Sequence, residues 1–401
     1  MPSPELPAPE PGWDDAAFRE SIQATLDEFI DEQARTLKPL GPDASRLIEA
    51  AHRSASGGKR FRAAFCYWGF KAVDDRPDST PDVGGLVRAA ASLELLHASA
   101  LVHDDYMDAS DTRRGRPATH KSFEAYHREH GWGGDPEQYG AAAAILLGDL
   151  LLSWSDELLR TCGLDHAVVR DALGFFDATR SEVIAGQFLD VSVQARGESD
   201  VEVAMRVLRY KSAKYSIERP LHIGASLAGG DQEVQRALTE FGLPLGEAFQ
   251  LRDDLLGVFG DPAVTGKPAG DDLSEGKRTV LVALALDKAP QEQSAILDAR
   301  LGTDLSADDV RVLQTIIEDS GAPGEVEKMI GELTDRSLSA LERAPITEHR
   351  ARRAALARDG GHPTGGLTLS WWAGARRVAR ARRSAGPRRA AARRTCRRGR
   401  R

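Results

Sequence analysis

The sequence predicts an all-α protein, a single large bundle of helices. Apolar residues recur three and four positions apart from Trp13 to about Pro345, which is the spacing of one face of a helix. Alternating strand patterns are scarce, and no proline occurs between Glu137 and Arg219. A chain of 401 residues is also long enough to bury a sizeable core.

The helices are expected between clusters of Gly, Pro and Asp, which interrupt the apolar periodicity. These clusters are residues 54–58, 75–84, 131–136, 197–200, 229–231 and 260–272. They leave about a dozen helices and no credible sheet. The pattern therefore predicts one large all-α domain over residues 13–345. Residues 1–12 are Pro-rich and are expected to be a disordered lead, and residues 346–401 a disordered tail rich in Arg, Gly and Ala.

Charge is distributed unevenly. Residues 360–401 contain 13 arginines and neither lysine nor acidic residues, so the preceding residues carry 40 basic and 61 acidic side chains. Such an acidic body repels a bare polyphosphate, and an anionic substrate is expected to arrive with divalent metal or to meet a local basic cluster. The basic tail fits a disordered extension without function, a segment that binds nucleic acid or anionic membrane, or an altered reading frame. We favour the first and expect no nucleic-acid partner.

The cysteines and the N-terminal residues indicate the cellular compartment of the protein. Cys66, Cys162 and Cys396 share no metal-type spacing and cannot form a disulfide framework, which indicates a reducing compartment. The N-terminus has neither the basic nor the apolar region of a signal peptide. No stretch approaches the ~18 consecutive apolar residues of a membrane span. We expect a cytoplasmic protein without a transmembrane segment.

The first candidate site is an aspartate cluster formed by Asp104, Asp105 and Asp108. On a helix Asp104 and Asp108 share a face, where like charges are destabilising unless a cation compensates them. Mg²⁺ is a hard cation that binds one or two carboxylates together with substrate phosphate. Because the flanking residues are apolar, these acids interrupt a buried helix, which favours a metal site over a solvated acidic face.

A second cluster, Asp253-Asp254, follows Phe249-Gln250 in another apolar helix. Two such clusters on separate helices can face one another across a bundle and hold metal ions between them. The second copy lacks a final aspartate, because Gly257 stands in that place. The glycine is either tolerated or impairs metal binding, and we favour tolerance.

Basic residues beside glycine are candidates for binding phosphate. The segment 57–62 (GGKRFR) places two glycines and three cations at a helix entry, where free N–H groups also favour an anion. Arg113-Arg114 follows the first cluster by five residues, and Lys211, Lys267 and Lys277 are further candidates. None of these segments matches the Walker A pattern and no strand precedes them, so a P-loop nucleotide site is disfavoured.

Together with His97, these motifs occur in the order found in trans-isoprenyl diphosphate synthases, the polyprenyl synthetase family. The similarity spans roughly residues 15–345. It is strongest to actinobacterial geranylgeranyl diphosphate synthases, whose sequences contain segments similar to RDDLLGVFGDP of this chain. The resemblance implies a helical bundle around a deep apolar cavity, usually a homodimer. It implies condensation of isopentenyl diphosphate with an allylic diphosphate (dimethylallyl, geranyl or farnesyl).

The resemblance also implies roles for individual residues. Asp104, Asp108 and Asp253 would bind Mg²⁺, three ions with substrate present, supported by Asp105 and Asp254. The residues implied to contact the allylic diphosphate are Arg113, Lys211 and Lys267. Those implied to hold isopentenyl diphosphate are Lys59, Arg62, His97 and Arg114. The remaining implied residues are Ser212 and Gln250 at the reaction centre, Lys277 closing over it, and Gln187 and Asp190, which either touch the diphosphate or only pack nearby.

Product length is expected to depend on the helix that carries Asp104. Ala100 and Ser99 lie four and five residues earlier on that face, and both are small. The next side chains are Leu96 and Leu93, at a rise of about 12 Å and about 16 Å from Asp104. A floor at that depth suits a geranylgeranyl product better than a farnesyl one.

Two alternatives remain open at this point. A class I terpene cyclase would share the helical fold and the first aspartate cluster, but the segment 57–62 with His97 and Arg114 argues for a second substrate site. A non-catalytic subunit of a heteromeric synthase would explain Gly257 and the basic tail.

Overall fold

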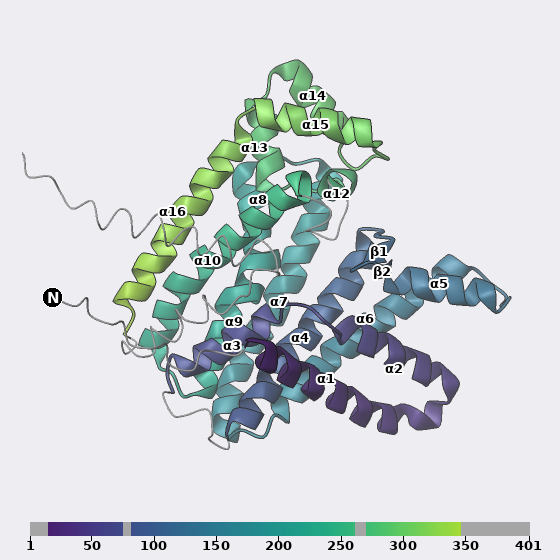
Figure 1. Cartoon of the computed structure of the whole chain (residues 1–401), viewed down its shortest axis with the longest axis vertical. Coiled ribbons are helices and arrows are strands. Elements are labelled where there is room, and N and C mark those ends of the chain that lie inside the picture. Colours follow the sequence, from purple (N-terminus) through teal and green to yellow (C-terminus); the bar gives the residue numbers. More distant parts are fainter. Residues whose placement is uncertain (1–14, 75–81, 261–269, 346–401) are drawn as a thin grey trace, which may run out of the picture. The chain divides into compact units, whose positions relative to one another are not determined.

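The computed structural model describes residues 15–74, 82–260 and 270–345. The predicted lead, tail and Lys267 lie outside these residues. Within them the all-α prediction is confirmed (Figure 1). The helices are α1 (Asp15–Leu37), α2 (Pro42–Ala55), α3 (Phe61–Lys71), α4 (Asp82–Met107), α5 (Thr119–Glu129), α6 (Pro136–Arg160), α7 (His166–Arg196), α8 (Val201–Val207), α9 (Arg219–Leu227), α10 (Gln232–Phe259), α12 (Asp271–Ser274), α13 (Val280–Lys288), α14 (Gln291–Arg300), α15 (Ala307–Asp319) and α16 (Ala322–Arg343). A short 3-10 helix, η1 (Lys38–Leu40), and a π-helix, η2 (Leu208–Glu218), complete the helical elements of the described residues.

Several predicted breaks are helix starts held by aspartate. The carboxylates of Asp135, Asp165, Asp200 and Asp231 accept backbone N–H groups in the first turns of α6, α7, α8 and α10. A side-chain oxygen at this position satisfies an N–H that the helix itself leaves unpaired. The local sequence therefore defines where these four helices begin.

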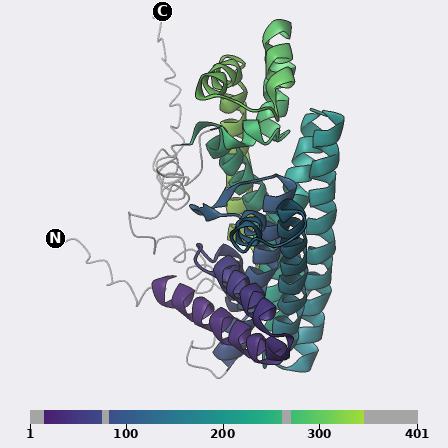
Figure 2. The same cartoon turned by 90° about the vertical axis from the view of Figure 1, so that its right-hand side faces the viewer.

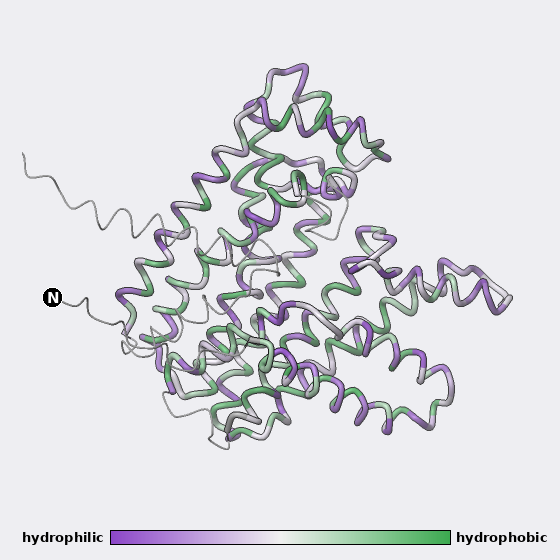
Figure 3. The backbone as a smooth tube through the Cα atoms, viewed as in Figure 1, coloured by the Kyte–Doolittle hydropathy of each residue, from purple (hydrophilic) through white to green (hydrophobic). Residues whose placement is uncertain are grey.

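The core lies along the inner faces of the longer helices. α4 packs along α6, whereas η2 and α9 pack against α7, and α16 packs along α10 (Figure 1). The largest fully buried side chains include Phe29, Phe176 and Leu151, each of which contributes roughly 1.5–3 kcal/mol by leaving water. Hydrophobic colour accordingly gathers along the inner helices in Figure 3, and hydrophilic colour along the outer α1 and α5. In the second view, α13, α14 and α15 lie at one end of the helical body and α1 and α2 at the other (Figure 2).

Helix α4 is long, apolar and mostly buried. Its stretch Gly84–Met107 is long and apolar enough to cross a membrane, with a mean hydropathy of 1.3, and 72% of that window is buried inside the protein. Burial all round is what a helix at the centre of a bundle requires. The first aspartate cluster stands at the end of this buried helix.

One small sheet departs from the all-helical expectation. Strands β1 (Thr112–Arg113) and β2 (Arg116–Pro117) pair antiparallel, with Arg113 opposite Arg116. Arg114 and Gly115 form the turn, and both have a positive φ, 53° and 71°. Two residues per strand are too few for alternation to be visible in the sequence. The hairpin folds the two predicted arginines back beside the end of α4.

Candidate active site

The first aspartate cluster ends α4 and is neutralised by two lysines. Asp108 lies just past the helix, but its N–H still donates to the Asp104 carbonyl at 2.8 Å, so the helical register continues. The Lys211 ammonium lies 3.3 Å from Asp104, and that of Lys277 lies 3.2 Å from Asp108. Burial raises the pKa of Asp104, but the two lysines outweigh it and hold the pKa below its ordinary value. Burial and the neighbouring Asp104 raise the pKa of Asp108.

Helix α7 supplies two further polar side chains to this cluster. Gln187 donates from Nε2 to Asp104 at 2.9 Å, and Asp190 accepts from the Lys211 ammonium at 2.6 Å. The approach depends on Gly186, because a Cβ there would lie 2.5 Å from the backbone nitrogen of Lys211. The sequence left the role of Gln187 and Asp190 open, and the structure brings both into contact with predicted site residues.

The second cluster is buried on α10. Burial raises the pKa of Asp253 to about 7 against the opposing effect of Lys59, and the Asp272 carboxylate adds to the increase. Burial raises the pKa of Asp254 to about 8, although the hydrogen bond from Gln250 Nε2, at 2.9 Å, acts in the opposite direction. Both carboxyl groups are thus substantially protonated at neutral pH, and a divalent cation that bound them would release protons.

The predicted segment 57–62 does not present all of its cations to the site. Arg60 has a left-handed φ of 55° and turns inward to pair with Glu94 on α4 at 3.3 Å, with both side chains 4% exposed. Arg60 also donates to the Ala55 carbonyl at 2.7 Å, and Glu94 accepts the Ala63 N–H at 3.1 Å. This buried pair anchors the segment on α4 and leaves Lys59 and Arg62 as its substrate-binding candidates.

Arg62, His97 and Arg114 converge from three separate elements. The Arg62 guanidinium donates to the Tyr215 hydroxyl at 2.6 Å and lies 4.2 Å from the centre of the Tyr215 ring. His97 Nδ1 is 3.1 Å from the same hydroxyl, and Arg114 donates to the Ser56 carbonyl at 2.6 Å. Burial and then the charges of Arg62, Arg114 and Arg113 lower the pKa of His97 well below its usual range. A neutral histidine among arginines marks a strongly electropositive site.

Tyr215 is a functional candidate that the sequence reasoning missed. Its phenol links Arg62 to His97 from η2, the same π-helix that carries Lys211 and the partly buried Ser212. The available signal was its position four residues after Lys211. π-Helical turns occur frequently at functional sites.

The two arginines of the hairpin have different surroundings. Arg113 Nε donates to the buried Asp105 at 2.7 Å, and Nη2 also pairs with that carboxylate. Asp105 therefore holds Arg113 beside the first cluster, whereas Arg114 joins the site around Arg62 and His97. The predicted chain-length residues Ser99 and Leu96 are buried on α4, 2% and 3% exposed, and Ala100 is partly buried.

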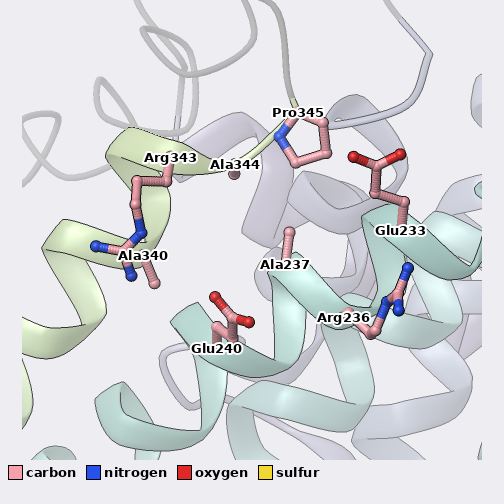
Figure 4. A pocket seen from close by; sticks show the side chains of 8 residues that line it. All are labelled: Glu233, Arg236, Ala237, Glu240, Ala340, Arg343, Ala344 and Pro345. Atoms are coloured by element: carbon pink, nitrogen blue, oxygen red, sulfur yellow. The ribbon is translucent and has the colours of Figure 1, made fainter.

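A pocket of about 270 Å³ lies elsewhere, between the start of α10 and the end of α16 (Figure 4). Its charged side chains are Glu233, Arg236, Glu240 and Arg343. Glu240 precedes Asp253 by 13 residues on α10, a rise of roughly 20 Å, so this pocket is separate from the aspartate clusters.

The donor set fits Mg²⁺. Hard carboxylate oxygens come from α4 and α10, and the Lys277 ammonium already occupies a cation position between Asp108 at 3.2 Å and Asp272 at 3.7 Å. Among the described residues, no three His, Cys, Asp or Glu side chains converge into a preformed metal cage. That arrangement suits an ion that takes one or two carboxylates and completes its shell with water and substrate phosphate.

The helical bundle carries two aspartate clusters, with Lys277 between Asp108 and Asp272, and two separate sets of cationic side chains. This combination is typical of enzymes that bind diphosphate esters together with Mg²⁺. The chain belongs to the polyprenyl synthetase family, whose model matches residues 45–319. A geranylgeranyl diphosphate synthase of Mycobacterium tuberculosis is 32% identical over 350 residues, 82% of this chain and 92% of the relative. A geranylfarnesyl diphosphate synthase of Aeropyrum pernix is 32% identical over 334 residues, 81% and 95% of the two chains.

A solved structure supports the same family assignment. The crystal structure of a geranylgeranyl pyrophosphate synthase from Corynebacterium glutamicum, complexed with isoprenyl diphosphate and magnesium, has a TM-score of 0.83 and 42% identity, covering 87% of this chain and 99% of that one. This chain is therefore a trans-prenyl diphosphate synthase, a prenyltransferase of isoprenoid biosynthesis whose substrates are isopentenyl diphosphate and an allylic diphosphate, and whose family depends on Mg²⁺. The terpene cyclase alternative is set aside by the same findings.

Proposed function

We propose that the enzyme makes geranylgeranyl diphosphate. The supporting observation is the small, buried surface of α4 below Asp104, where Ser99 is 2% exposed and the next large side chains are Leu96 and Leu93. These leucines lie at a helical rise of about 12 Å and about 16 Å from Asp104. The mycobacterial and corynebacterial relatives that carry this product in their names support the same length.

Chain-length analysis of the products tests this proposal. Purified protein would be incubated with isopentenyl diphosphate and each of the dimethylallyl, geranyl and farnesyl primers. Ser99→Phe places an aromatic ring in the proposed path and should shorten the product, whereas Ser99→Ala keeps the space and should leave it unchanged. An unchanged product profile in Ser99→Phe would contradict the placement of the chain along α4.

The proposed mechanism divides the charged residues between two diphosphates. Mg²⁺, held as three ions by Asp104, Asp108 and Asp253, would neutralise charge on the departing pyrophosphate. Lys211, Lys277 and Arg113 lie beside the first cluster, and their positive charges stabilise the same leaving group. We also assign Lys267 to this set by the family resemblance. Ser212 and Gln250 would line the reaction centre between the two sets.

The second cation set positions the nucleophile. Lys59, Arg62, His97 and Arg114 hold the diphosphate of isopentenyl diphosphate, so that its double bond stands next to the allylic carbon from which pyrophosphate departs. Pyrophosphate takes the final proton, and no protein base is needed. Arg114→Gln should raise the KM for isopentenyl diphosphate and leave that for the allylic primer nearly unchanged. Turnover by the isolated chain excludes a non-catalytic subunit.

We also propose that two copies associate and that the enzyme is cytoplasmic. Five large apolar side chains on two helices are exposed: Ile145 (45%) and Leu146 (61%) on α6, and Ile184 (55%), Phe188 (73%) and Val191 (39%) on α7. Exposed apolar residues in that number are typical of an interaction surface. Light scattering coupled to size-exclusion chromatography should give twice the chain mass, and Leu146→Asp should reduce it. A monomeric wild-type mass would refute the dimer.

A further inference from the structure

The third position of the second aspartate cluster is not empty. Gly257 lies four residues after Asp253, on the same face of α10. A Cβ at this position would meet the Asp272 carboxylate, with Oδ2 at 1.9 Å and Cγ at 2.5 Å. The three nearest atoms all belong to that one carboxylate. The space in which a side chain at 257 would begin is therefore filled by an acidic group from another element.

Backbone contacts hold Asp272 in this place. The Gly270 N–H donates to the Gly257 carbonyl at 3.1 Å, which fixes the start of α12 against α10. The Lys277 N–H donates to the Asp272 carbonyl at 2.9 Å, and Leu273 is fully buried. The backbone of Asp272 is thus held beside α10, within reach of the position that a side chain at residue 257 would take.

Asp272 also faces the first cluster. Its carboxylate lies 3.7 Å from the Lys277 ammonium, which in turn lies 3.2 Å from Asp108. This ammonium, which also pairs with Glu275, therefore links Asp108 to Asp272. The Asp272 carboxylate is close enough to raise the pKa of both Asp253 and Asp254. The Asp272 carboxylate thus stands where the side chain of a third member of the second cluster would begin.

We propose that Asp272 supplies the carboxylate that the second cluster lacks, and that residue 257 is glycine because this carboxylate occupies its side-chain position. The inference rests on the proposed role of Asp253 in holding Mg²⁺. On this view the acidic group that is missing at residue 257 is not lost but is supplied from a position 15 residues later in the chain.

The test measures how Mg²⁺ stabilises the full-length protein in the presence of inorganic pyrophosphate, the reaction's own leaving group. The thermal unfolding midpoint would be followed against Mg²⁺ concentration, which needs no turnover. Asp272→Asn should raise the Mg²⁺ concentration for half-maximal stabilisation about 10- to 100-fold, the usual effect of losing a supporting group at a metal site. Asp271→Asn, the same charge change one residue earlier, should shift it less than about twofold.

Two variants at residue 257 separate charge from position. Gly257→Ala changes no charge, yet its Cβ must displace Asp272, so it should weaken the Mg²⁺ response as Asp272→Asn does. The relocation variant Gly257→Asp/Asp272→Ala restores one carboxylate on α10 and should regain most of the response. It also keeps the idea testable should Gly257→Ala lower the unfolding midpoint without ligand.

Two outcomes would overturn the inference alone, and a third would overturn the site assignment on which it rests. The first is a wild-type Mg²⁺ response in Asp272→Asn together with a lost response in Asp253→Asn. This result would refute the role of Asp272 but keep the proposed metal site at Asp253. The second is a relocation variant no better than Asp272→Ala alone. A wild-type response in Asp253→Asn as well would overturn the assignment of the site itself.

Discussion

Replacing Glu94 by Gln should destabilise the protein and loosen the proposed isopentenyl diphosphate site. The change keeps the shape of the side chain but removes the negative charge that lies 3.3 Å from the Arg60 guanidinium, and both side chains are 4% exposed. Leaving one member of a buried ion pair uncompensated costs about 3–5 kcal/mol. With an unfolding entropy of about 2.1 cal/mol/K per residue over roughly 330 residues, that loss lowers the melting temperature by ~4–7 °C.

Calorimetry and steady-state kinetics check both consequences. Because the Arg60–Glu94 pair anchors the segment 57–62, Glu94→Gln should raise the KM for isopentenyl diphosphate more than it lowers kcat. The matched control is the double variant Arg60→Met/Glu94→Leu, in which no charge is stranded, and its stability should exceed that of Glu94→Gln. A Glu94→Gln protein that melts within 1 °C of wild type would refute the reasoning.

Three other predictions concern pH, Tyr215 and the tail. Without Mg²⁺ the folded pKa values of Asp253 and Asp254, about 7 and about 8, exceed the unfolded value of about 3.9, so the folded state binds more protons and its stability should fall as pH rises from about 4 to about 8. Urea unfolding in EDTA at pH 5 and pH 8 measures this, and an Asp254→Asn protein should show a shallower dependence. Tyr215→Phe removes the hydroxyl that accepts from Arg62 and should raise the KM for isopentenyl diphosphate about tenfold, with an unchanged KM counting against the link. Deleting residues 360–401 should leave prenyl transfer unchanged, and loss of turnover would give the basic tail a function.

The sequence predicted what depends on local spacing. Asp104 and Asp108, four residues apart in one apolar helix, indicated a candidate metal site on α4, and the adjacent pair Asp253-Asp254 in another indicated one on α10. Glycine beside lysine or arginine indicated candidate phosphate contacts. Clusters of Gly, Pro and Asp located the breaks where Asp135, Asp200 and Asp231 begin their helices. These features need no knowledge of which segments meet in space.

What the sequence did not show depends on close approaches between segments. Arg60 could be recognised as cationic but not as inward-facing, because its left-handed backbone leaves no sign in a single sequence. Tyr215 became a site residue only where η2 packs beside α3 and α4. Asp272 lay in a segment interpreted as a break, and only the fold places its carboxylate at Gly257.

The placement of Lys277 between Asp108 and Asp272 has a thermodynamic consequence. Its ammonium offsets the repulsion between the two carboxylates. If Mg²⁺ binds them as proposed, loading would exchange one cation for another and would leave the ammonium available to a diphosphate. Since such coupling is reciprocal, diphosphate must strengthen Mg²⁺ binding by the same factor by which Mg²⁺ strengthens diphosphate binding. One lysine thereby favours loading of the metal and the substrate as a unit over either alone.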